Sequence, residues 1–363
     1  MRADRNLVTQ YAVCSKGGSI LRTVRLVLVG VGNLGRRFCQ ILVDKGDMLR
    51  EKYGLDFVLV GAADSRGAAY DPAGLDLAEV VRLKQAGGSV SAYAGAGRSD
   101  WDTLSFVEAM EADVLLEASP VNLEQGGEPG LTCIRTAMRR GMHVVTPNKG
   151  PLVLAYRELH ELAKKQEVQF RFDGTVAGGL PAVNLGVRDL RGADIQKLEA
   201  VPNLVTGYVM DLLVDGVPWD DALARARDEG VLEADAAWDL DGWDAAAKLV
   251  ILTNAILDYP ATLDEVARAG VVGLDPQELT AARARGERYR LVARAERSED
   301  GGYTLSVSPV PLSPEHPFGH LGRKQMAVRY TTDIYGIITA VIEEPDPIPS
   351  SATMLRDLLA IYA

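Results

Sequence analysis

The sequence is poor in cysteine and in positive charge, and both shortages narrow the classes of protein it can represent. Only Cys14, Cys39 and Cys133 occur among 363 residues, without metal-ligand spacing, which suits a reducing cytosol. The net charge of −11 and the pI near 5.0 argue against nucleic acids or anionic membrane surfaces as partners. We therefore expect a cytoplasmic protein that binds neither.

Long apolar runs are missing as well, and no segment approaches the length needed to span a membrane. Residues 1–22 lack the apolar centre and cleavage site of a signal peptide, so we expect a loose N-terminal extension. What is present is an ordinary globular composition, 47 % hydrophobic and 25 % charged, on a chain long enough for two domains.

Residues 23–150 alternate between short apolar strands and helical patterns. The run 24–29 is β-branched and ends in glycines, which is typical of a buried parallel strand. The expected strands are 24–29, 57–63, 114–116 and 143–145, and the expected helices are 34–51, 76–86 and 131–139. This alternation predicts an α/β domain with a doubly wound parallel sheet.

Residues 151–345 follow a different pattern. The expected helices are 155–165, 205–213, 219–228 and 243–257, with one more after the Gly-rich turn 174–179. The expected strands are 168–172, 198–201, 288–295, 303–307, 326–331 and 336–342. The late strands fit antiparallel hairpins, so we expect an α+β domain with a mixed sheet. Residues 346–363 should contain a terminal helix, near 352–361, that packs back on the first domain.

A glycine-rich loop follows the first expected strand and opens the first helix. In that setting Gly-x-Gly-x-x-Gly predicts a Rossmann dinucleotide site, because the helix N-terminus offers amide hydrogens and partial positive charge to a pyrophosphate. The loop residues expected to bind the cofactor are Gly30, Val31, Gly32, Asn33, Leu34 and Gly35. Gly30 would permit the tight turn, Gly32 the approach of the ligand, and Gly35 close helix packing. The alternative is a tight turn without a ligand.

Asp64 closes the second expected strand, where an acid holds the ribose 2′-hydroxyl of NAD and disfavours the 2′-phosphate of NADP. Arg66 follows two residues later and is placed to meet that phosphate instead. The structural alternative makes Asp64 a turn-forming residue. The sequence thus favours NAD and leaves NADP open.

The segment Glu233–Lys248 is rich in acids and ends in a lysine at the start of an apolar helix. Asp244 and Lys248 are four residues apart, so both project from one helix face. One interpretation is a surface ion pair worth a few tenths of a kcal/mol. The other is a proton-handling pair at the mouth of a site.

Together these motifs resemble the homoserine dehydrogenase family. The likeness rests on four anchors in family order, namely residues 30–35, Val-Thr-Pro-Asn-Lys-Gly at 145–150, Gly-Thr-Val-Ala-Gly-Gly-Leu-Pro at 174–181, and Glu233–Lys248. It implies a Rossmann domain, a substrate and dimerisation domain, and a homodimer. The implied reaction is the NAD(P)-dependent interconversion of L-homoserine, a small hydroxy amino acid, and L-aspartate 4-semialdehyde in threonine and methionine biosynthesis.

The resemblance also implies roles for single residues. Lys149, after the fourth strand of the nucleotide domain, matches the family's lysine near the nicotinamide and the reacting oxygen, and Ser119 belongs to the same cofactor site. Lys248 and Asp244 match the second catalytic lysine and its neighbouring acid. A lysine suits this chemistry, because it can accept the hydroxyl proton or, as a cation, stabilise the developing alkoxide.

On the substrate side, Glu233 and Asp239 match acids of the family's pocket. The segment 203–208 departs from the family's Asn-Gly-Thr-x-Asn-Tyr, because Leu204 and Val205 replace the Gly-Thr pair. Thr206, one residue later than the family's threonine, would then supply the hydroxyl that Val205 lacks. The departure keeps open a paralogue acting on another small polar hydroxy compound, or a binding protein without turnover. We expect no feedback control through the ACT module that extends some members.

The resemblance further implies a sodium site, in which a monovalent cation is held by the carboxylate at Asp173 and the backbone carbonyls of Val176, Gly178 and Leu180. The family usually has Glu where this chain has Asp173. Cys133, at a helical position, is expected to pack as a small apolar residue rather than act as a nucleophile.

Overall fold

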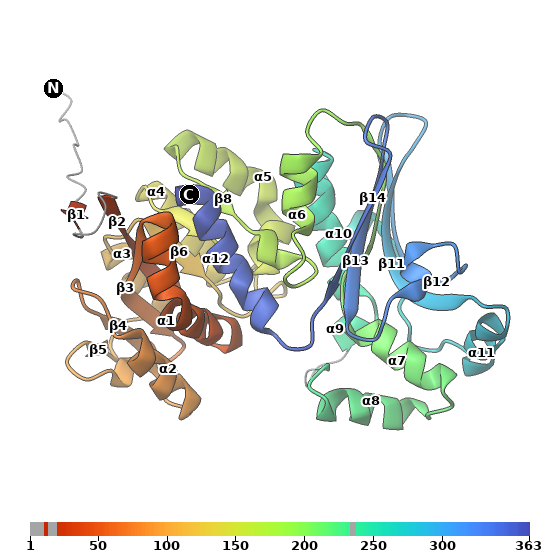
Figure 1. The fold of residues 1–363 in the computed structure, drawn as a ribbon, viewed down its shortest axis with the longest axis horizontal. Helices are drawn as coiled ribbons and strands as arrows, with labels where there is room; N and C mark the ends of the chain where they lie inside the picture. The colour runs from red at the N-terminus through yellow and green to blue at the C-terminus, as the bar shows by residue number, and fades with distance from the viewer. Residues whose placement is uncertain (1–10, 14–19, 233–236) are drawn as a thin grey trace. The chain divides into compact units, whose positions relative to one another are not determined.

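The computed structural model describes residues 11–13, 20–232 and 237–363, with only the backbone for residues 11–13 and 20. It divides into two units (Figure 1). Unit one comprises Met1–Gly150, Glu158–Phe172 and Met354–Ala363, and unit two comprises Pro151–Arg157 and Asp173–Thr353. The chain therefore changes unit twice within helix α5, Lys149–Gln166, once after Phe172, and once within helix α12, Ile348–Tyr362. Glu233, expected at the substrate, lies outside the described residues.

Unit one is built on a mainly parallel sheet in the order β5-β4-β3-β2-β6-β7-β8, with β1 antiparallel beside β2. The strands are β1 Tyr11–Val13, β2 Ile20–Val29, β3 Leu55–Asp64, β4 Gly67–Tyr70, β5 Gly97–Arg98, β6 Val114–Glu117, β7 His143–Val145 and β8 Phe170–Arg171. β3 and β6 lie on opposite sides of β2, so the order reverses there. Ligands of doubly wound sheets bind at the carboxyl ends of the strands at such a switch point. The predicted doubly wound sheet is confirmed.

Helices pack on the strands of unit one. Besides α5 and α12 they are α1 Asn33–Tyr53, α2 Leu77–Gln85, η1 Val90–Ala92, α3 Thr103–Ala109 and α4 Gly130–Arg139. α3, β4 and β5 were not expected, because these segments are short and β5 pairs with β4 only across a long connection. Met354 and Leu358 of α12 belong to the apolar core of unit one, and Tyr362 contacts Phe57 with ring centroids 6.5 Å apart.

The start of α5 differs from the expectation. The helix begins at Lys149 rather than near residue 155, because the Asn148 side chain accepts a hydrogen bond from Gly150 N (3.0 Å) and caps it. Ala155 instead interrupts the helical dihedrals, with φ −144° and ψ 26°. Lys149 is therefore the first residue of a capped helix.

Unit two contains a sheet in the order β10-β12-β11-β9-β13-β14. The strands are β9 Ile195–Val201, β10 Val266–Arg268, β11 Arg288–Arg297, β12 Tyr303–Leu312, β13 Gln325–Thr332 and β14 Ile337–Glu343. β10 runs parallel to β12 and the other neighbours are antiparallel, so the predicted mixed sheet is confirmed.

The helical elements of unit two are η2 Asp173–Thr175, α6 Ala182–Asn184, η3 Leu185–Asp189, α7 Val205–Val214, α8 Trp219–Asp228, α9 Ala237–Leu240, α10 Trp243–Ile256, η4 Leu263–Glu265, α11 Pro276–Ala284 and η5 Pro317–His320. Helices α7, α10 and α11 of unit two pack on strand β11, and α8 packs on α7 (Figure 1). α10 packs on β11 and is buried from Asp244 to Asn254 except at Lys248. An acid and a lysine thus begin a nearly buried apolar helix.

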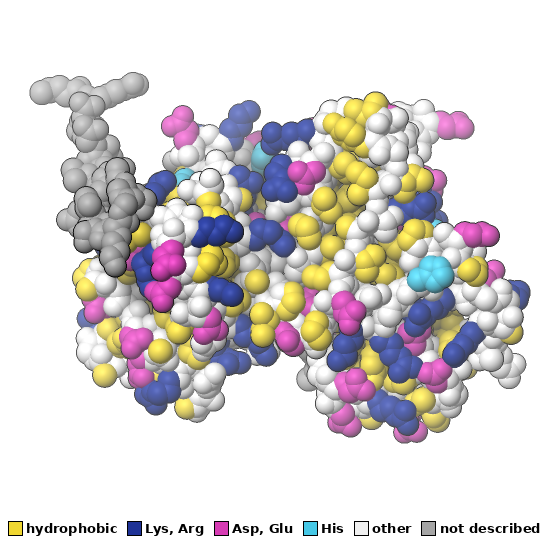
Figure 2. All heavy atoms as spheres, viewed as in Figure 1, with side chains coloured by type: hydrophobic (Ala, Val, Ile, Leu, Met, Phe, Trp, Pro, Cys, Tyr) yellow, Lys and Arg dark blue, Asp and Glu magenta, His cyan; other side chains and the backbone are white. Residues whose placement is uncertain are grey.

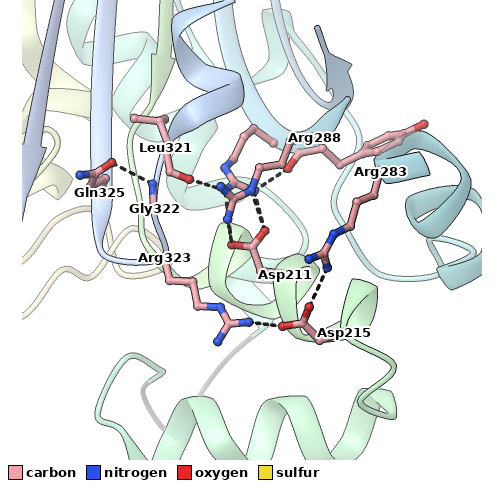
Figure 3. Close-up of polar contacts among 10 residues, drawn as sticks. Asp211, Asp215, Arg283, Arg288, Leu321, Gly322, Arg323 and Gln325 are labelled. Atoms are coloured by element: carbon pink, nitrogen blue, oxygen red, sulfur yellow. Dashed lines mark hydrogen bonds and ion pairs between the residues drawn. The ribbon is translucent and has the colours of Figure 1, made fainter. Parts of the chain in front are cut away.

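Two aspartates on and after α7 each bind two arginines (Figure 3). Asp211 accepts hydrogen bonds from Arg288 (2.5 and 3.0 Å) and from the buried Arg290 (3.0 and 3.3 Å). Burial lowers the pKa of Arg290, and the charge of Asp211 opposes that shift. Asp215 pairs with Arg283 (2.7 Å) and with Arg323. The first cluster joins α7 to β11 inside unit two.

We predict that Asp211→Asn destabilises the protein by about 3–5 kcal/mol, because it leaves the buried Arg290 without a carboxylate. Thermal unfolding followed by scanning fluorimetry measures the effect. Asp215→Asn is the matched control, since that side chain is 40 % exposed and its pairs are worth no more than about 1 kcal/mol. Equal losses for the two variants would contradict this assignment.

Candidate functional site

The glycine loop in unit one adopts the conformation that the motif predicts. Gly30 has φ +88°, and a Cβ built there would lie 2.2 Å from Ala118 O. A Cβ on Gly35 would lie 2.2 Å from Gly30 O. Packing of the protein alone therefore requires glycine at both positions.

Gly32 is different, because packing does not explain it. It is the N-cap of α1 with φ −85°, and a Cβ built there meets nothing within 4 Å. The protein leaves open space beside this backbone at a helix N-terminus, where a phosphate binds well. The residues present thus fit a dinucleotide, whose close approach would account for a glycine at position 32.

A cavity of about 350 Å³ lies at this loop. It is lined by Val31, Gly32, Asn33, Arg36, Lys84 and Gln85. Arg36 and Lys84 bring positive charge to a surface suited to phosphates. Sequence reasoning missed both residues. Arg36 could have been predicted, because it directly follows the glycine motif. Lys84 could not, because it reaches the loop only through the packing of α2 on α1.

Asp64 has a structural role that uses all its hydrogen-bonding capacity. Oδ1 accepts from Arg66 N (3.0 Å) and Ser89 Oγ (2.8 Å), and Oδ2 accepts from Lys84 Nζ (2.6 Å) and Val90 N (3.1 Å). Burial raises the pKa of Asp64, but these four donors outweigh it and hold the pKa below its usual value. A carboxylate has about four acceptor positions. A ribose hydroxyl would have to displace one of these donors.

Ser119 and Lys149 are joined through a buried network in unit one. Ser119 Oγ donates to Glu117, and Asn148 Nδ2 donates to Ser119 Oγ (3.3 Å). Asn148 caps the helix that begins at Lys149. The backbone of Ala118 and Ser119 also packs directly against Gly30. The glycine loop, Ser119 and Lys149 thus belong to one connected region.

The pair Asp244 and Lys248 is buried in unit two. Lys248 Nζ donates to Asp244 Oδ2 (2.7 Å) and to Pro202 O (2.8 Å). The two side chains are only 4 % and 13 % exposed, so the interpretation as a solvated surface pair is wrong. Removing two charges from water is costly unless they are paired and hydrogen bonded. Such a pair is a candidate functional group.

Asn203 extends this pair into a network. Its Nδ2 donates to Asp244 Oδ2 (3.1 Å) and Asp239 Oδ1 (3.2 Å), and its Oδ1 accepts from Thr206 Oγ1 (3.0 Å). Asp239, Asp244, Lys248 and Thr206, all named from the sequence, therefore lie around one amide. Sequence reasoning noted Asn203 only as part of a motif, because its partners are up to 41 residues away.

The implied sodium site stays a prediction. Asp173 Oδ1 accepts from Asn184 N (2.9 Å), and Leu180 O accepts from Ala182 N (2.8 Å). The carboxylate of Glu344 lies against Gly178, and Glu344 Oε2 accepts from Gly179 N (3.2 Å). Across residues 20–232 and 237–363, no group of three or more His, Cys, Asp or Glu side chains is arranged to hold a metal ion.

Cys133 is buried, as expected, and burial raises the pKa of its thiol to about 12. A second cavity, of about 390 Å³ in unit two, is lined by the ion-paired residues of Figure 3 and by none of the residues predicted for the site.

No helix in the described part of the chain has both the length and the apolar character of a membrane span.

Comparison with protein families gives two adjoining matches. Residues 30–173 match the model "Homoserine dehydrogenase, NAD binding domain", and residues 181–359 match the model "Homoserine dehydrogenase". A homoserine dehydrogenase of Methanocaldococcus jannaschii is 34 % identical, covering 93 % of this chain and 98 % of the relative. An NAD(+)-dependent homoserine dehydrogenase of Pseudomonas canavaninivorans is 31 % identical, covering 93 % and 96 %.

Solved structures agree with these matches. A structure from Archaeoglobus fulgidus, assigned as a homoserine dehydrogenase, has a TM-score of 0.83 at 30 % identity and covers 94 % of this chain and 99 % of its own. A hyperthermophilic archaeal homoserine dehydrogenase in complex with NADPH has a TM-score of 0.78 at 25 % identity, covering 93 % and 98 %. The similarity thus extends through both units.

We predict that Gly32→Ala weakens dinucleotide binding at least about tenfold, because a methyl group would occupy the space left for the ligand. The cost to folding should stay near or below about 1 kcal/mol, as the methyl meets no protein atom. Titration of NAD(P)H fluorescence and thermal unfolding measure the two effects. Unchanged affinity would remove Gly32 from the cofactor site. Gly35→Ala is the contrasting variant, in which stability should fall first.

Proposed function

The chain belongs to the homoserine dehydrogenase family, and we propose that it interconverts L-homoserine and L-aspartate 4-semialdehyde by hydride transfer with a nicotinamide cofactor. Members of this family are NAD(P)-dependent oxidoreductases that act on a CH–OH group. The observation that carries the proposal is the buried network of Lys248, Asp244 and Asn203. A purely structural helix start would not need two charges at this depth.

In this proposal Lys248 handles the proton of the reacting hydroxyl. Its Nζ has three donor positions, and two of them point to Asp244 and Pro202 O. As an ammonium group, Lys248 can stabilise the alkoxide that develops when a hydride reaches the aldehyde carbon. In the oxidising direction the neutral amine would accept the hydroxyl proton. Lys149 is assigned to the cofactor side of the reaction.

The substrate's amino group suits the acidic side of this network. Asp239 and Asp244 both lie within hydrogen-bond distance of Asn203, and their negative charges would attract an ammonium group. Glu233 would add to that charge. The Thr206 hydroxyl donates to Asn203 Oδ1, so we assign Thr206 the role of orienting the Asn203 amide. Leu204 and Val205 bring apolar side chains next to these polar groups.

The cofactor would lie on the glycine loop, with its phosphates near the α1 N-terminus, Arg36 and Lys84. Bound nicotinamide supplies or accepts the hydride. The preference for NAD rested on Asp64 as a ribose ligand, and the four donors already on Asp64 weaken that argument. We therefore propose a site for either cofactor, NAD or NADP. A monovalent cation near Asp173 and a cytoplasmic location stay predictions from the sequence.

The assay is oxidation of L-homoserine with NAD or NADP at alkaline pH, followed by the absorbance of the reduced nicotinamide. Lys248→Ala should lower kcat about 10²–10⁴-fold, the range for general acid–base groups, with cofactor affinity unchanged. Lys165→Ala, an exposed lysine, is the control and should keep full activity. Equal losses of turnover and cofactor affinity would take Lys248 out of the chemistry. A signal with another hydroxy amino acid alone would keep the reaction class and favour the paralogue suggested by Leu204 and Val205.

We further propose that the protein is a homodimer joined through the β14 side of the second sheet. β14 is an edge strand, and Ile337 and Val341 on it are 56 % and 47 % exposed. Ile334 and Tyr335, in the preceding turn, are exposed as well. Figure 2 shows hydrophobic side chains gathered over this part of unit two. Contiguous exposed apolar surface of this kind usually marks a protein interface.

Light scattering after size exclusion tests the dimer. The unaltered protein should elute at twice the mass of one chain. The double variant Ile337→Asp and Val341→Asp should elute as a monomer with its fold retained, because it places charges on the interface without touching the core. A dimer that survives both substitutions would place the interface elsewhere.

A further inference from the structure

The proposed reaction leaves one buried acid unexplained. Glu117 ends strand β6 in unit one, and its side chain is fully buried. It carries no salt bridge among the residues that the structure describes. A buried carboxylate without a cation has to be compensated by donors or be neutralised by a proton.

The partners of the carboxyl group, from Ser119, Thr146 and the side chain of Asn148, are all neutral. Oε1 accepts from Ser119 N (2.9 Å) and from Ser119 Oγ. Oε2 lies 3.0 Å from Thr146 Oγ1. That hydroxyl oxygen also lies 2.8 Å from the carbonyl oxygen of Glu117 and accepts a hydrogen bond from Asn148 N (3.0 Å).

The single hydrogen of the Thr146 hydroxyl favours the protonated form of Glu117. The hydroxyl has one hydrogen, yet two oxygens of Glu117 lie within hydrogen-bond distance of it. If Glu117 were ionised, the single hydrogen of Thr146 would have to be divided between the two oxygens, which weakens both contacts. If Oε2 carries a proton, Glu117 donates to Thr146 and Thr146 donates to the carbonyl. Burial, which raises the pKa of Glu117 against the hydrogen bonds that lower it, acts in the same direction.

The same network leads to the residues assigned to the cofactor. Asn148 contacts Thr146 through its backbone and Ser119 through its side chain, and it caps the helix that starts at Lys149. The Ala118–Ser119 backbone packs against Gly30. A neutral acid here connects the glycine loop to the start of α5 and adds no negative charge beside the cofactor's phosphates.

We propose that Glu117 is a protonated positioning residue that holds Ser119, Asn148 and thereby the Lys149 end of α5 in place beside the glycine loop. The role assigned to Lys149 rests on the proposed function, whereas the protonation of Glu117 does not. The residue touches neither substrate nor cofactor in this proposal and acts through the groups it orients.

The first test is the infrared spectrum of the full-length protein at neutral pH. The difference between the unaltered protein and Glu117→Gln should contain the carbonyl band of a protonated carboxylic acid. The same difference for Glu128→Gln, an acid outside this network whose carboxylate accepts hydrogen bonds from Thr132, should show the band of an ionised carboxylate. A carboxylate band lost in Glu117→Gln would overturn the proposal.

The second test separates charge from shape. Glu117→Gln keeps a neutral group of the same length that can still donate to Thr146, so kcat should stay within about threefold. Glu117→Asp keeps the acid but shortens it, so kcat should fall about tenfold or more while the protein stays folded. The opposite order, with Asp active and Gln inactive, would show that the charge matters and contradict the proposal.

The two proposals can fail separately. If the unaltered protein does not turn over homoserine, the function is wrong, yet the infrared bands and the NAD(P)H titrations of the same variants still test Glu117. In those titrations Glu117→Gln should bind the cofactor as the unaltered protein does, and Glu117→Asp should bind it more weakly.

Discussion

A carboxylate buried in an apolar helix needs a counter-charge and hydrogen-bond donors, and Asp244 receives both from Lys248 and Asn203. This requirement sets the geometry of the second unit around its site. Lys248 has to approach Pro202 O, so α10 is held against the segment that follows β9. Asn203 in turn orients Asp239 and Thr206. In the proposed proton transfer, groups fixed in this way would need little reorganisation.

The first unit meets a different constraint, because its backbone has to come close to a charged ligand. Gly30 and Gly35 are glycines for reasons of packing, and Gly32 is a glycine although the protein leaves room for a side chain. The side chains that line the cavity beside the loop are neutral or positively charged, among them Arg36 and Lys84, and Lys84 also pairs with Asp64. These charges agree with the proposed cofactor site in unit one.

Much of the fold could be predicted from the sequence, because the strong patterns are local. The run before Gly30, the long helix α1 and the buried helix α10 each carry their signal within one segment. Asp244 and Lys248 were found for the same reason. Asn203, Lys84 and Glu117 were missed or undervalued, since their roles depend on partners 20 to 41 residues away. The start of α5 was misplaced because Asn148 acts as a cap through a single side-chain hydrogen bond.

The central claim is that this chain transfers hydride between a nicotinamide and the carbinol carbon of homoserine. Deuterium transfer tests it most directly. The protein would be incubated with L-aspartate 4-semialdehyde and NADH or NADPH carrying deuterium at the reacting carbon, and the product analysed by mass spectrometry. The account predicts homoserine with one deuterium on the carbon that bears the hydroxyl, formed far more slowly by Lys248→Ala. Reduced cofactor that binds but leaves no deuterium in any hydroxy product would contradict it.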